Sequence, residues 1–414
     1  MNEAPILIAS QLLELVKKTY GASTISSNPP LSPLEVFDSK YQIEDLCGQL
    51  LRTVLGPLAY TTLLAESCQE SSALGFITTL GVPDLLGDTT MSLSEISDAL
   101  GVNAKYLKVA LNCLTRHGYF HEAVGPSGSL TYGNNELSSV LKETHPTSVK
   151  NAVGFICDEG FKATSHLLPA SKSAAPGEKE LVAVNLAFGF NGPLFDWMSQ
   201  EAWRGKRMGN AMKQLHNVVN GNVITDYDWP ALESPIIDIG GGIGSLELAL
   251  VKECPESPFQ FVIFDIPETI VNAKKVWEEQ PLSINFSVAF QAGNFMADKF
   301  DDTLLPTGMP TYLIRHVLHD WSDPQVLHIL KHVYTAMSTR PAAHPKPKLI
   351  LCEMLLRADS HRFIRTTSMQ LLSLGGGLTR TEMEMVLLLE KAGFSVVKSQ
   401  RLRAADSIIE AIIP

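Results

Sequence analysis

The apolar positions of the chain follow two different patterns, and the change comes near residue 160. Before it, apolar residues recur at helical spacing, most clearly over residues 43–86, which predicts helices. After it, short apolar runs such as residues 259–265 alternate with longer segments of helical spacing. Strands separated by helices predict a mostly parallel, doubly wound α/β sheet that is covered on both faces. We therefore expect two domains, residues 1–160 and 161–414.

The end of the chain departs from this alternation, because its last two apolar runs have no helix between them. Two strands that follow each other directly form a hairpin, so we expect one antiparallel strand at this end of the sheet.

Residues 91–122 have the pattern of a winged helix. Ser92 or Ser94 is placed to cap a short helix, Gly101 to turn the chain, and Asn103 to cap a second helix. A DNA-binding protein would place that second helix in a groove, but the net charge of −11 disfavours phosphate contacts. We expect a helical, winged-helix-like dimerisation domain with no nucleic-acid partner. The apolar helices before it pack either within the domain or against a second subunit. A DNA-binding regulator that retains an inactive enzyme fold is the disfavoured alternative.

The remaining composition narrows the class of protein. Six cysteines are scattered and none forms a C-x-x-C pair, so we expect neither a zinc site nor a redox pair. The first 20 residues have helical spacing without the basic start of a signal peptide. No apolar run approaches the about 20 residues that a membrane span needs. These features predict a cytoplasmic protein with no metal and no membrane partner.

A glycine-rich loop, D-I-G-G-G-I-G at residues 238–244, follows one predicted strand and opens a helix. Glycines in such a turn permit positive φ and let the backbone approach a ligand closely. The next strand ends at Asp265, where a carboxylate can accept hydrogen bonds from both hydroxyls of a ribose. The alternative role for Asp265 is to cap the helix that follows. Together the two features favour a nucleoside site.

The segment R-H-V-L-H-D-W-S-D, residues 315–323, directly follows another apolar strand. His319 in this segment, Glu353 at the end of the next strand and Glu384 in the first turn of a later helix can meet at the carboxyl edge of the sheet, where doubly wound folds bind ligands. A histidine can remove a hydroxyl proton at neutral pH when carboxylates fix its tautomer. For His319 alone, a core or capping role is the alternative. Three groups on three segments favour a catalytic cluster.

Four motifs together carry a family resemblance: D-I-G-G-G-I-G, F-D-I-P, L-H-D-W-S-D and G-G-x-x-R-T-x-x-E. The chain resembles the S-adenosylmethionine-dependent O-methyltransferases, especially the branch of plant caffeate-type and fungal secondary-metabolite enzymes. The resemblance implies a class I methyltransferase fold with a Rossmann-like sheet, an N-terminal dimerisation domain, a homodimer, and S-adenosylmethionine as cofactor. It also implies that His319 is the general base and that Glu353 and Glu384 orient it.

The resemblance assigns further site residues. Asn294 stands where the family usually has an aspartate that reaches the adenine amino group, and an amide oxygen can still accept that hydrogen bond. His316 stands where the family often has a tryptophan, which makes one wall of the pocket more polar. The residues expected to bind the cofactor are Gly240, Gly241, Gly242, Asp265, Ile266, Asn294, Phe295 and Arg315, and those expected to contact the substrate are Met212, His316 and Asp320.

The function that this set predicts is methylation of a hydroxyl on a small secondary metabolite. Some fungal relatives of the fold keep S-adenosylmethionine but catalyse dehydrations and pericyclic reactions (Diels–Alder or ene-type) of polyketide–amino acid, pyridone-type metabolites. Arg315, His316, His319 and Asp320 can stabilise developing negative charge, as such a cyclase would need. A pericyclase has no need of a base with paired carboxylates, so methyl transfer is favoured.

Overall fold

The computed structural model describes residues 3–21, 31–125, 128–172, 181–280, 285–297, 305–341 and 344–414. The chain divides into two compact units, Met1–Val219 and Asn220–Pro414. Helix α12 (Ala202–Val219) packs against α7 (Lys150–Phe155), so the first unit extends further along the chain than the boundary near residue 160. As a boundary between functional domains, residue 160 stays a prediction.

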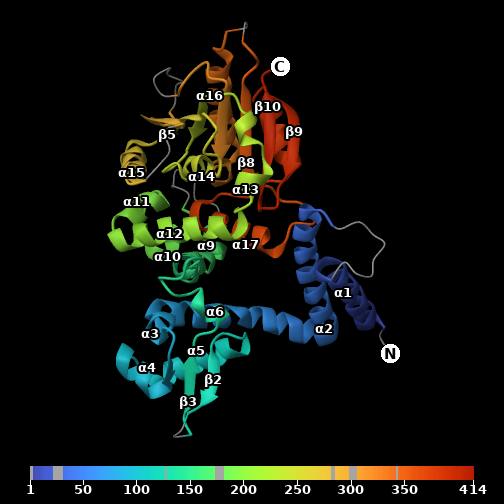
Figure 1. Cartoon of the computed structure of the whole chain (residues 1–414), viewed down its shortest axis with the longest axis vertical. Helices are drawn as coiled ribbons and strands as arrows, with labels where there is room; N and C mark the ends of the chain where they lie inside the picture. Colours follow the sequence, from blue (N-terminus) through green and yellow to red (C-terminus); the bar gives the residue numbers. More distant parts are fainter. Residues whose placement is uncertain are drawn as a thin grey trace. The chain divides into compact units, whose positions relative to one another are not determined.

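The first unit is mainly helical (Figure 1), and its longest helix, α2, bends at Gly56, whose φ is +73°, just before Pro57. The other helices are α1 (Ala4–Tyr20), α3 (Val82–Leu86), α4 (Leu93–Leu100), α5 (Ala104–Arg116), α6 (Glu136–Ser139), α8 (Phe161–Thr164), α9 (Leu167–Ala170), α10 (Ala183–Phe188), α11 (Leu194–Ser199) and a π-helical turn at Ile156–Gly160; α2 spans Pro33–Leu80.

The predicted winged helix is present. Ser92 caps α4 in a capping box with Glu95, Gly101 ends the helix at φ +64°, and Asn103 caps α5. Three short strands pair antiparallel in the order β1-β3-β2: β1 (Thr90–Ser92), β2 (His121–Val124) and β3 (Leu130–Gly133). The local capping signals were sufficient to predict this module.

The second unit holds a seven-stranded sheet in the order β6-β5-β4-β7-β8-β10-β9. The pairs from β6 to β8 are parallel, and β10 runs antiparallel to both β8 and β9. The doubly wound parallel sheet and its C-terminal hairpin are therefore confirmed. The strands are β4 (Ile236–Ile239), β5 (Gln260–Asp265), β6 (Ser287–Ala292), β7 (Thr311–Arg315), β8 (Lys348–Met354), β9 (Ser395–Arg401) and β10 (Asp406–Ile412).

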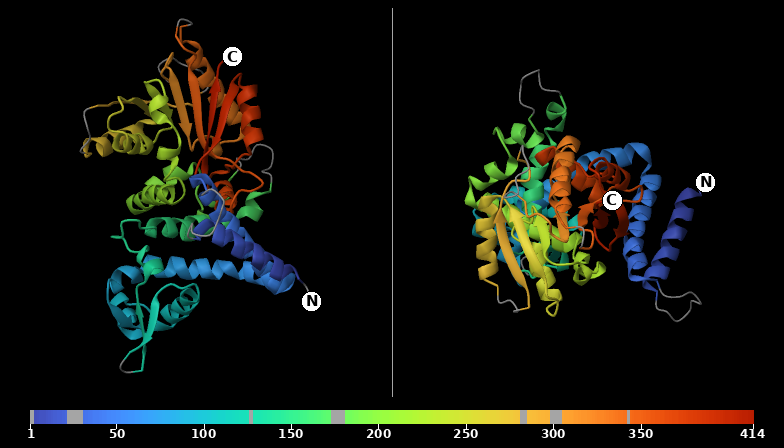
Figure 2. Two further views of the ribbon diagram at one scale, coloured as in Figure 1. Left: turned by 45° about the vertical axis from the view of Figure 1, so that its right-hand side comes forward. Right: turned by 90° about the horizontal axis from the view of Figure 1, so that it is seen from above.

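Helices cover both faces of this sheet (Figure 2). Alternate residues of β7 point to opposite faces, so Ile314 packs toward α16 and α18 while Leu313 packs toward α13 and α14. Burying each such side chain stabilises the fold by about 1.5–3 kcal/mol and holds the strand ends in place. The helices are α13 (Val223–Asp226), α14 (Ser245–Glu253), α15 (Pro267–Glu278), α16 (Asp323–Ser338), α17 (Arg362–Gly375) and α18 (Glu382–Lys391), with short 3-10 turns at Trp229–Ala231 and Leu318–Asp320.

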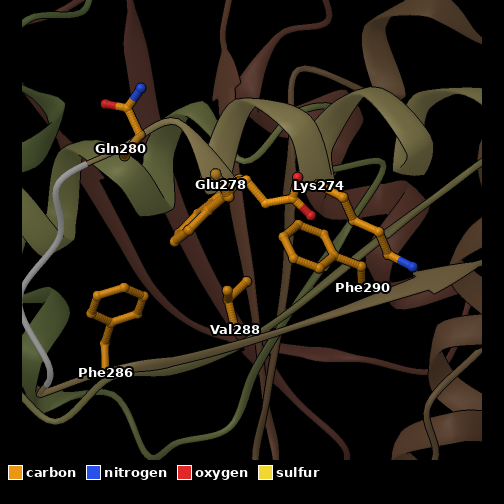
Figure 3. A pocket seen from close by; sticks show the side chains of 7 residues that line it. Lys274, Glu278, Gln280, Phe286, Val288 and Phe290 are labelled. Carbon is orange, nitrogen blue, oxygen red and sulfur yellow. The ribbon is translucent and has the colours of Figure 1, made fainter.

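A small apolar cluster lies between α15 and the edge strand β6. Phe286, Val288 and Phe290 line a shallow pocket beside Lys274 and other side chains of α15 (Figure 3). Trp277 of the same helix donates a hydrogen bond to the Ile243 carbonyl, with Nε1 and O 2.9 Å apart. Trp277 therefore connects this cluster to the glycine loop. Among the described residues, none of the helices combines the length and the hydropathy needed to cross a bilayer.

Candidate active site

The ends of β7 and β8 bring His319 and Glu353 together in a buried pair. Nδ1 of His319 lies 2.7 Å from Oε2 of Glu353. The other carboxylate oxygen accepts hydrogen bonds from the backbone N–H groups of Val317 at 3.0 Å and Leu318 at 2.9 Å. A carboxylate held by three hydrogen bonds fixes the proton on Nδ1, so Nε2 is the nitrogen of His319 that is left for chemistry.

The surroundings change the protonation of both partners. Burial disfavours the charged imidazolium, but the Glu353 carboxylate and, to a smaller extent, Asp320 and Asp406 outweigh it and raise the pKa of His319 to about 9. Burial opposes ionisation of Glu353, yet the charge and the hydrogen bond of His319 lower the pKa of Glu353. Burial raises the pKa of Asp320, whose Oδ1 lies 3.7 Å from Nε2 of His319. At neutral pH His319 is therefore mostly an imidazolium.

The motif G-G-x-x-R-T holds the loop that carries His319. The Arg380 side chain is almost completely buried and donates to the carbonyl oxygens of Leu318 at 2.8 Å and Trp321 at 2.7 Å. The Leu378 N–H donates to the His319 carbonyl at 2.8 Å, and a Cβ at Gly377 would collide with that same oxygen. Arg380 and Gly377 thus position the backbone of His319. The sequence pattern did not predict this role.

Glu384, by contrast, caps a helix. Its Oε2 accepts hydrogen bonds from the backbone N–H of Thr381 at 2.7 Å and from the Thr381 hydroxyl at 2.8 Å, which completes a capping box at the start of α18. Within the described part of the chain, no hydrogen bond or ion pair joins Glu384 to His319. The role predicted for Glu384 as a second orienting carboxylate stays a prediction, and this geometry does not support it.

The second histidine of the motif forms a pair of its own. His316 has a left-handed backbone, with φ +54°, and its Nε2 lies 2.7 and 2.8 Å from the two carboxylate oxygens of Asp406. Asp406 is the first residue of β10, and its side chain is fully buried. Sequence reasoning missed Asp406, because only the antiparallel register that pairs Asp406 with Met354 brings it to this edge.

The glycine loop lies against the loop of His319. Gly240 and Gly242 have φ of +73° and +61°, and a Cβ at Gly240 would come within 2.6 Å of Cγ2 of Val317. Asp265 accepts hydrogen bonds from the N–H of Gly242 at 2.8 Å and of Ile266 at 2.7 Å. Only glycine at position 240 lets these two loops approach so closely.

Comparisons with known proteins show the family of the chain. The model of the O-methyltransferase domain family matches residues 172–395, and that of the O-methyltransferase dimerisation domain matches residues 63–144. The chain belongs to the O-methyltransferase family. The enzyme uses S-adenosylmethionine, and its fold is that of the class I methyltransferases.

Individual relatives of this O-methyltransferase come from fungi and from Streptomyces. The O-methyltransferase gedA of Aspergillus terreus is 24% identical over 96% of this chain and 91% of its own length. The mitomycin biosynthesis 6-O-methyltransferase of Streptomyces lavendulae is 27% identical over 81% of this chain and 88% of its own length. The structure of the mitomycin 7-O-methyltransferase MmcR superposes with a TM-score of 0.71, at 25% identity over 86% of this chain and 97% of that chain.

The loop residues fit the nucleoside part of S-adenosylmethionine. The Asp265 carboxylate accepts two backbone hydrogen bonds and one from the Thr269 side chain, which leaves one of its four lone pairs for a ribose hydroxyl. A Cβ at Gly242 would meet no atom within 4 Å, so the loop leaves open space on this side. The Ile266 side chain is 45% exposed beside it. Gly241 instead faces inward, because its Cβ would come within 2.6 Å of Oδ2 of Asp238.

Asn294 and Phe295 follow β6 at the same edge. Oδ1 of Asn294 accepts a hydrogen bond from the Met296 N–H at 2.8 Å, so one of its two lone pairs is already used. The Phe295 ring would lie 3.5 Å from a Cβ at Gly240 and packs edge-on against Trp321. Phe295 therefore lines the glycine loop, and the adenine contact of Asn294 stays a prediction.

Arg315 lies among buried acids. Burial opposes the charge of Arg315, but the acidic groups around it raise the pKa of Arg315, and its Nε is 3.9 Å from Oδ2 of Asp406. Burial, with Glu247 as a neighbour, raises the pKa of Asp238 well above its usual range. Arg315 thus compensates buried carboxyls beneath the glycine loop, and its contact with the cofactor stays a prediction.

The predicted substrate contacts are spread over both units. Asp320 and His316 lie beside His319. Met212 belongs to α12 in the first unit, with a side chain that is 41% exposed. The contact of Met212 with a substrate stays a prediction.

We expect Asp265→Ala to raise the Kd for S-adenosylmethionine about 10- to 100-fold, because hydrogen bonds to a charged acceptor contribute about 1.5–3 kcal/mol. Titration calorimetry measures this Kd. Asp265→Asn keeps the shape and one acceptor, so its loss should be smaller. Glu268→Ala, at an exposed acid in the first turn of α15, is the matched control and should leave the affinity within about twofold. An unchanged Kd for Asp265→Ala would remove the ribose role.

Proposed function

We propose that this O-methyltransferase methylates a hydroxyl group of a small secondary metabolite and that His319 is the general base. The buried His319–Glu353 pair, with Nδ1 and Oε2 2.7 Å apart, is the observation that carries the proposal. The loop of His319 contacts the glycine loop through Val317 and Gly240, so base and cofactor site share one edge of the sheet. The relatives named above are O-methyltransferases of secondary metabolism, which supports this class of substrate.

The residues have separable tasks in this proposal. S-adenosylmethionine, when bound, supplies an electrophilic methyl group. Glu353 keeps Nδ1 of His319 protonated, so that Nε2 takes the proton of the acceptor hydroxyl. The Glu353 carboxylate then stabilises the imidazolium that results, and Arg380 and Gly377 keep the ring in place through the backbone. Placement of the oxygen supplies much of the rate increase in a displacement of this kind.

The raised pKa of His319 predicts a rate that increases with pH. The base form is neutral, so with a pKa of about 9 it is scarce at pH 7 and is gained as pH rises through 9. We expect kcat/KM for the acceptor to rise about tenfold per pH unit between pH 6.5 and 8.5 and to level off near pH 9. Glu353→Gln removes the charge that raises the pKa of His319. In this variant kcat/KM should therefore start to rise at a lower pH, and its maximum value should be lower than in the wild type. A flat profile in the wild type would contradict the assignment of the base.

Methyl transfer is supported over the alternative of a cyclase that keeps its cofactor intact, because the matched relatives are methyltransferases. A single incubation separates the two. The protein is mixed with hydroxylated aromatic metabolites and S-adenosylmethionine, and mass spectrometry follows both product and S-adenosylhomocysteine. A methylated product with an equal amount of S-adenosylhomocysteine is expected. A product of unchanged or dehydrated mass without S-adenosylhomocysteine would establish the cyclase instead.

We also propose that the enzyme acts as a homodimer formed by its first domain. The match to the dimerisation domain supports this, as do the exposed apolar side chains of α1 and α2, among them Ile6 at 71% and Leu58 at 85% exposure. Light scattering after gel filtration should give twice the chain mass of 45.2 kDa. A mass of one chain at micromolar concentration would contradict the dimer.

A further inference from the structure

Two imidazoles, each anchored by a buried carboxylate, lie side by side at the end of β7. The His319 pair uses Nδ1 and Glu353 of β8, and the His316 pair uses Nε2 and Asp406 of β10. The two ring centres are 5.6 Å apart, and the ring planes are tilted by 42°. The proposed methyl transfer uses only the His319–Glu353 pair, and it gives no function to the His316–Asp406 pair.

The His316 pair is built as firmly as the first. Both oxygens of Asp406 face Nε2, and the Asp406 side chain has no exposed surface. The Asp406 N–H donates to Oδ1 of the buried Asn220 at 3.1 Å, and Sγ of Cys352 lies 3.6 Å from Oδ2. Asp406 is therefore a positioning residue that fixes the tautomer and the direction of the His316 ring.

The backbone of His316 supports the same conclusion. Its φ of +54° is uncommon for a residue other than glycine, and such conformations concentrate at functional sites. The side chain of His316 keeps 29% of its surface exposed, whereas that of His319 keeps 10%. Among the described residues, none forms a hydrogen bond with Nδ1 of His316. That nitrogen is the polar atom of the pair that remains available to a ligand.

We propose that Nδ1 of His316 binds a second oxygen of the acceptor, next to the hydroxyl that His319 deprotonates. The acceptor is then an aromatic compound with two neighbouring oxygens, either adjacent hydroxyls or a hydroxyl beside a carbonyl. This inference rests on the proposed function, because it takes His319 as the base at the same site. Neutral His316 accepts from a hydroxyl through Nδ1, and protonated His316 donates to a carbonyl.

The spacing of the rings matches this class of acceptor. Neighbouring oxygens on one aromatic framework are separated by about 2.8 Å, close to a hydrogen-bond length. Two imidazoles with centres 5.6 Å apart can each reach one oxygen of such a pair. Hydroxyls on opposite ends of the framework are too far apart for both contacts. The second contact also orients the acceptor, and it selects which hydroxyl meets Nε2 of His319.

Two isomeric diols test the proposal. The full-length enzyme is assayed with 2,3-dihydroxynaphthalene and 2,6-dihydroxynaphthalene by release of S-adenosylhomocysteine. In the wild type we expect kcat/KM to be about tenfold higher for the adjacent diol, which is the effect of one further hydrogen bond. In His316→Asn and Asp406→Asn we expect this ratio to fall below about twofold. Asparagine tolerates a positive φ, so His316→Asn keeps the backbone of the loop. His344→Asn, at an exposed histidine before β8, is the control and should keep the wild-type ratio.

Where turnover is too slow to detect, the preference between the two diols is measured as the ratio of their Kd values. The Kd of each diol is measured by calorimetry with S-adenosylhomocysteine present, which also shows that each variant is folded. Equal values for the two diols in the wild type, in both rate and affinity, would overturn the role of His316, as would a preference that survives in both variants. His319→Ala separates the two proposals. If it kept the wild-type rate while the preference for the adjacent diol still depended on His316, the proposed base would fail and the second contact would stand.

Discussion

His319→Ala is expected to lower kcat by about 10²–10⁴-fold while leaving the affinity for S-adenosylmethionine nearly unchanged, because a positioned general base contributes rate increases of this size. The side chain is buried and bonded to Glu353, and Val317 is the residue of its segment that lies next to Gly240 of the glycine loop. Removing the imidazole therefore removes the proposed proton acceptor and leaves the cofactor loop in place. Single-turnover kinetics for the rate and calorimetry for the Kd measure the two effects.

The control for this variant is His344→Ala, at an exposed histidine on the opposite end of β8 from Glu353. It should keep the wild-type kcat. A His319→Ala enzyme that still methylates at the wild-type rate would refute the assignment of the base. A large parallel loss of cofactor affinity would indicate instead that the substitution had disturbed the loop.

Arg380→Met is expected to lower the free energy of unfolding of the second unit by about 3 kcal/mol and to reduce kcat as well. The guanidinium bonds to the carbonyls of Leu318 and Trp321 and to Oδ1 of Asp323 at 2.9 Å. Methionine leaves two carbonyls without a buried donor, and each such group costs about 1–3 kcal/mol. Because these carbonyls flank His319, the loop that holds this histidine loosens at the same time.

Urea unfolding followed by tryptophan fluorescence measures the stability, and S-adenosylhomocysteine release measures the rate. Arg401→Met is the matched control, because this arginine lies on the edge strand β9 with 40% of its side chain exposed and forms an ion pair with the exposed Asp359. Its effect should stay below about 1 kcal/mol. Equal stability losses in the two variants would show that Arg380 is not the clamp of the loop.

Much of this site was predictable because its signals are local. The glycine loop, the acid at the end of β5 and the histidine after β7 each stand at a strand end, and the strand pattern alone shows that these ends share an edge. The same reasoning predicted that His319 and Glu353 lie at one edge of the sheet, and the family resemblance predicted that Glu353 orients His319. The pattern did not show that the pair raises the pKa of His319 to about 9, since this depends on burial and on the charges of Asp320 and Asp406.

Glu384 and Asp406 show where such reasoning stops. The motif R-T-x-x-E predicted that Glu384 belongs to the site. Its spacing from Thr381 is also that of a capping box, and in the structure the Glu384 carboxylate accepts the hydrogen bonds of that capping box. Asp406 belongs to no motif, and 90 positions separate it from His316. Its place depends on the antiparallel insertion of β10 between β8 and β9.

The sequence by itself determined the class of fold, the family and the cofactor, and it predicted His319 as the base, because helical and strand periodicity, glycine turns and strand-end side chains are properties of short segments. Only the tertiary structure decided which carboxylate meets which histidine. Sheet order and register bring together residues 34 and 90 positions apart, and burial then sets their charge. The pairs His319–Glu353 and His316–Asp406 are products of packing, because a hydrogen bond requires contact between atoms and the strand pattern alone leaves that contact undetermined.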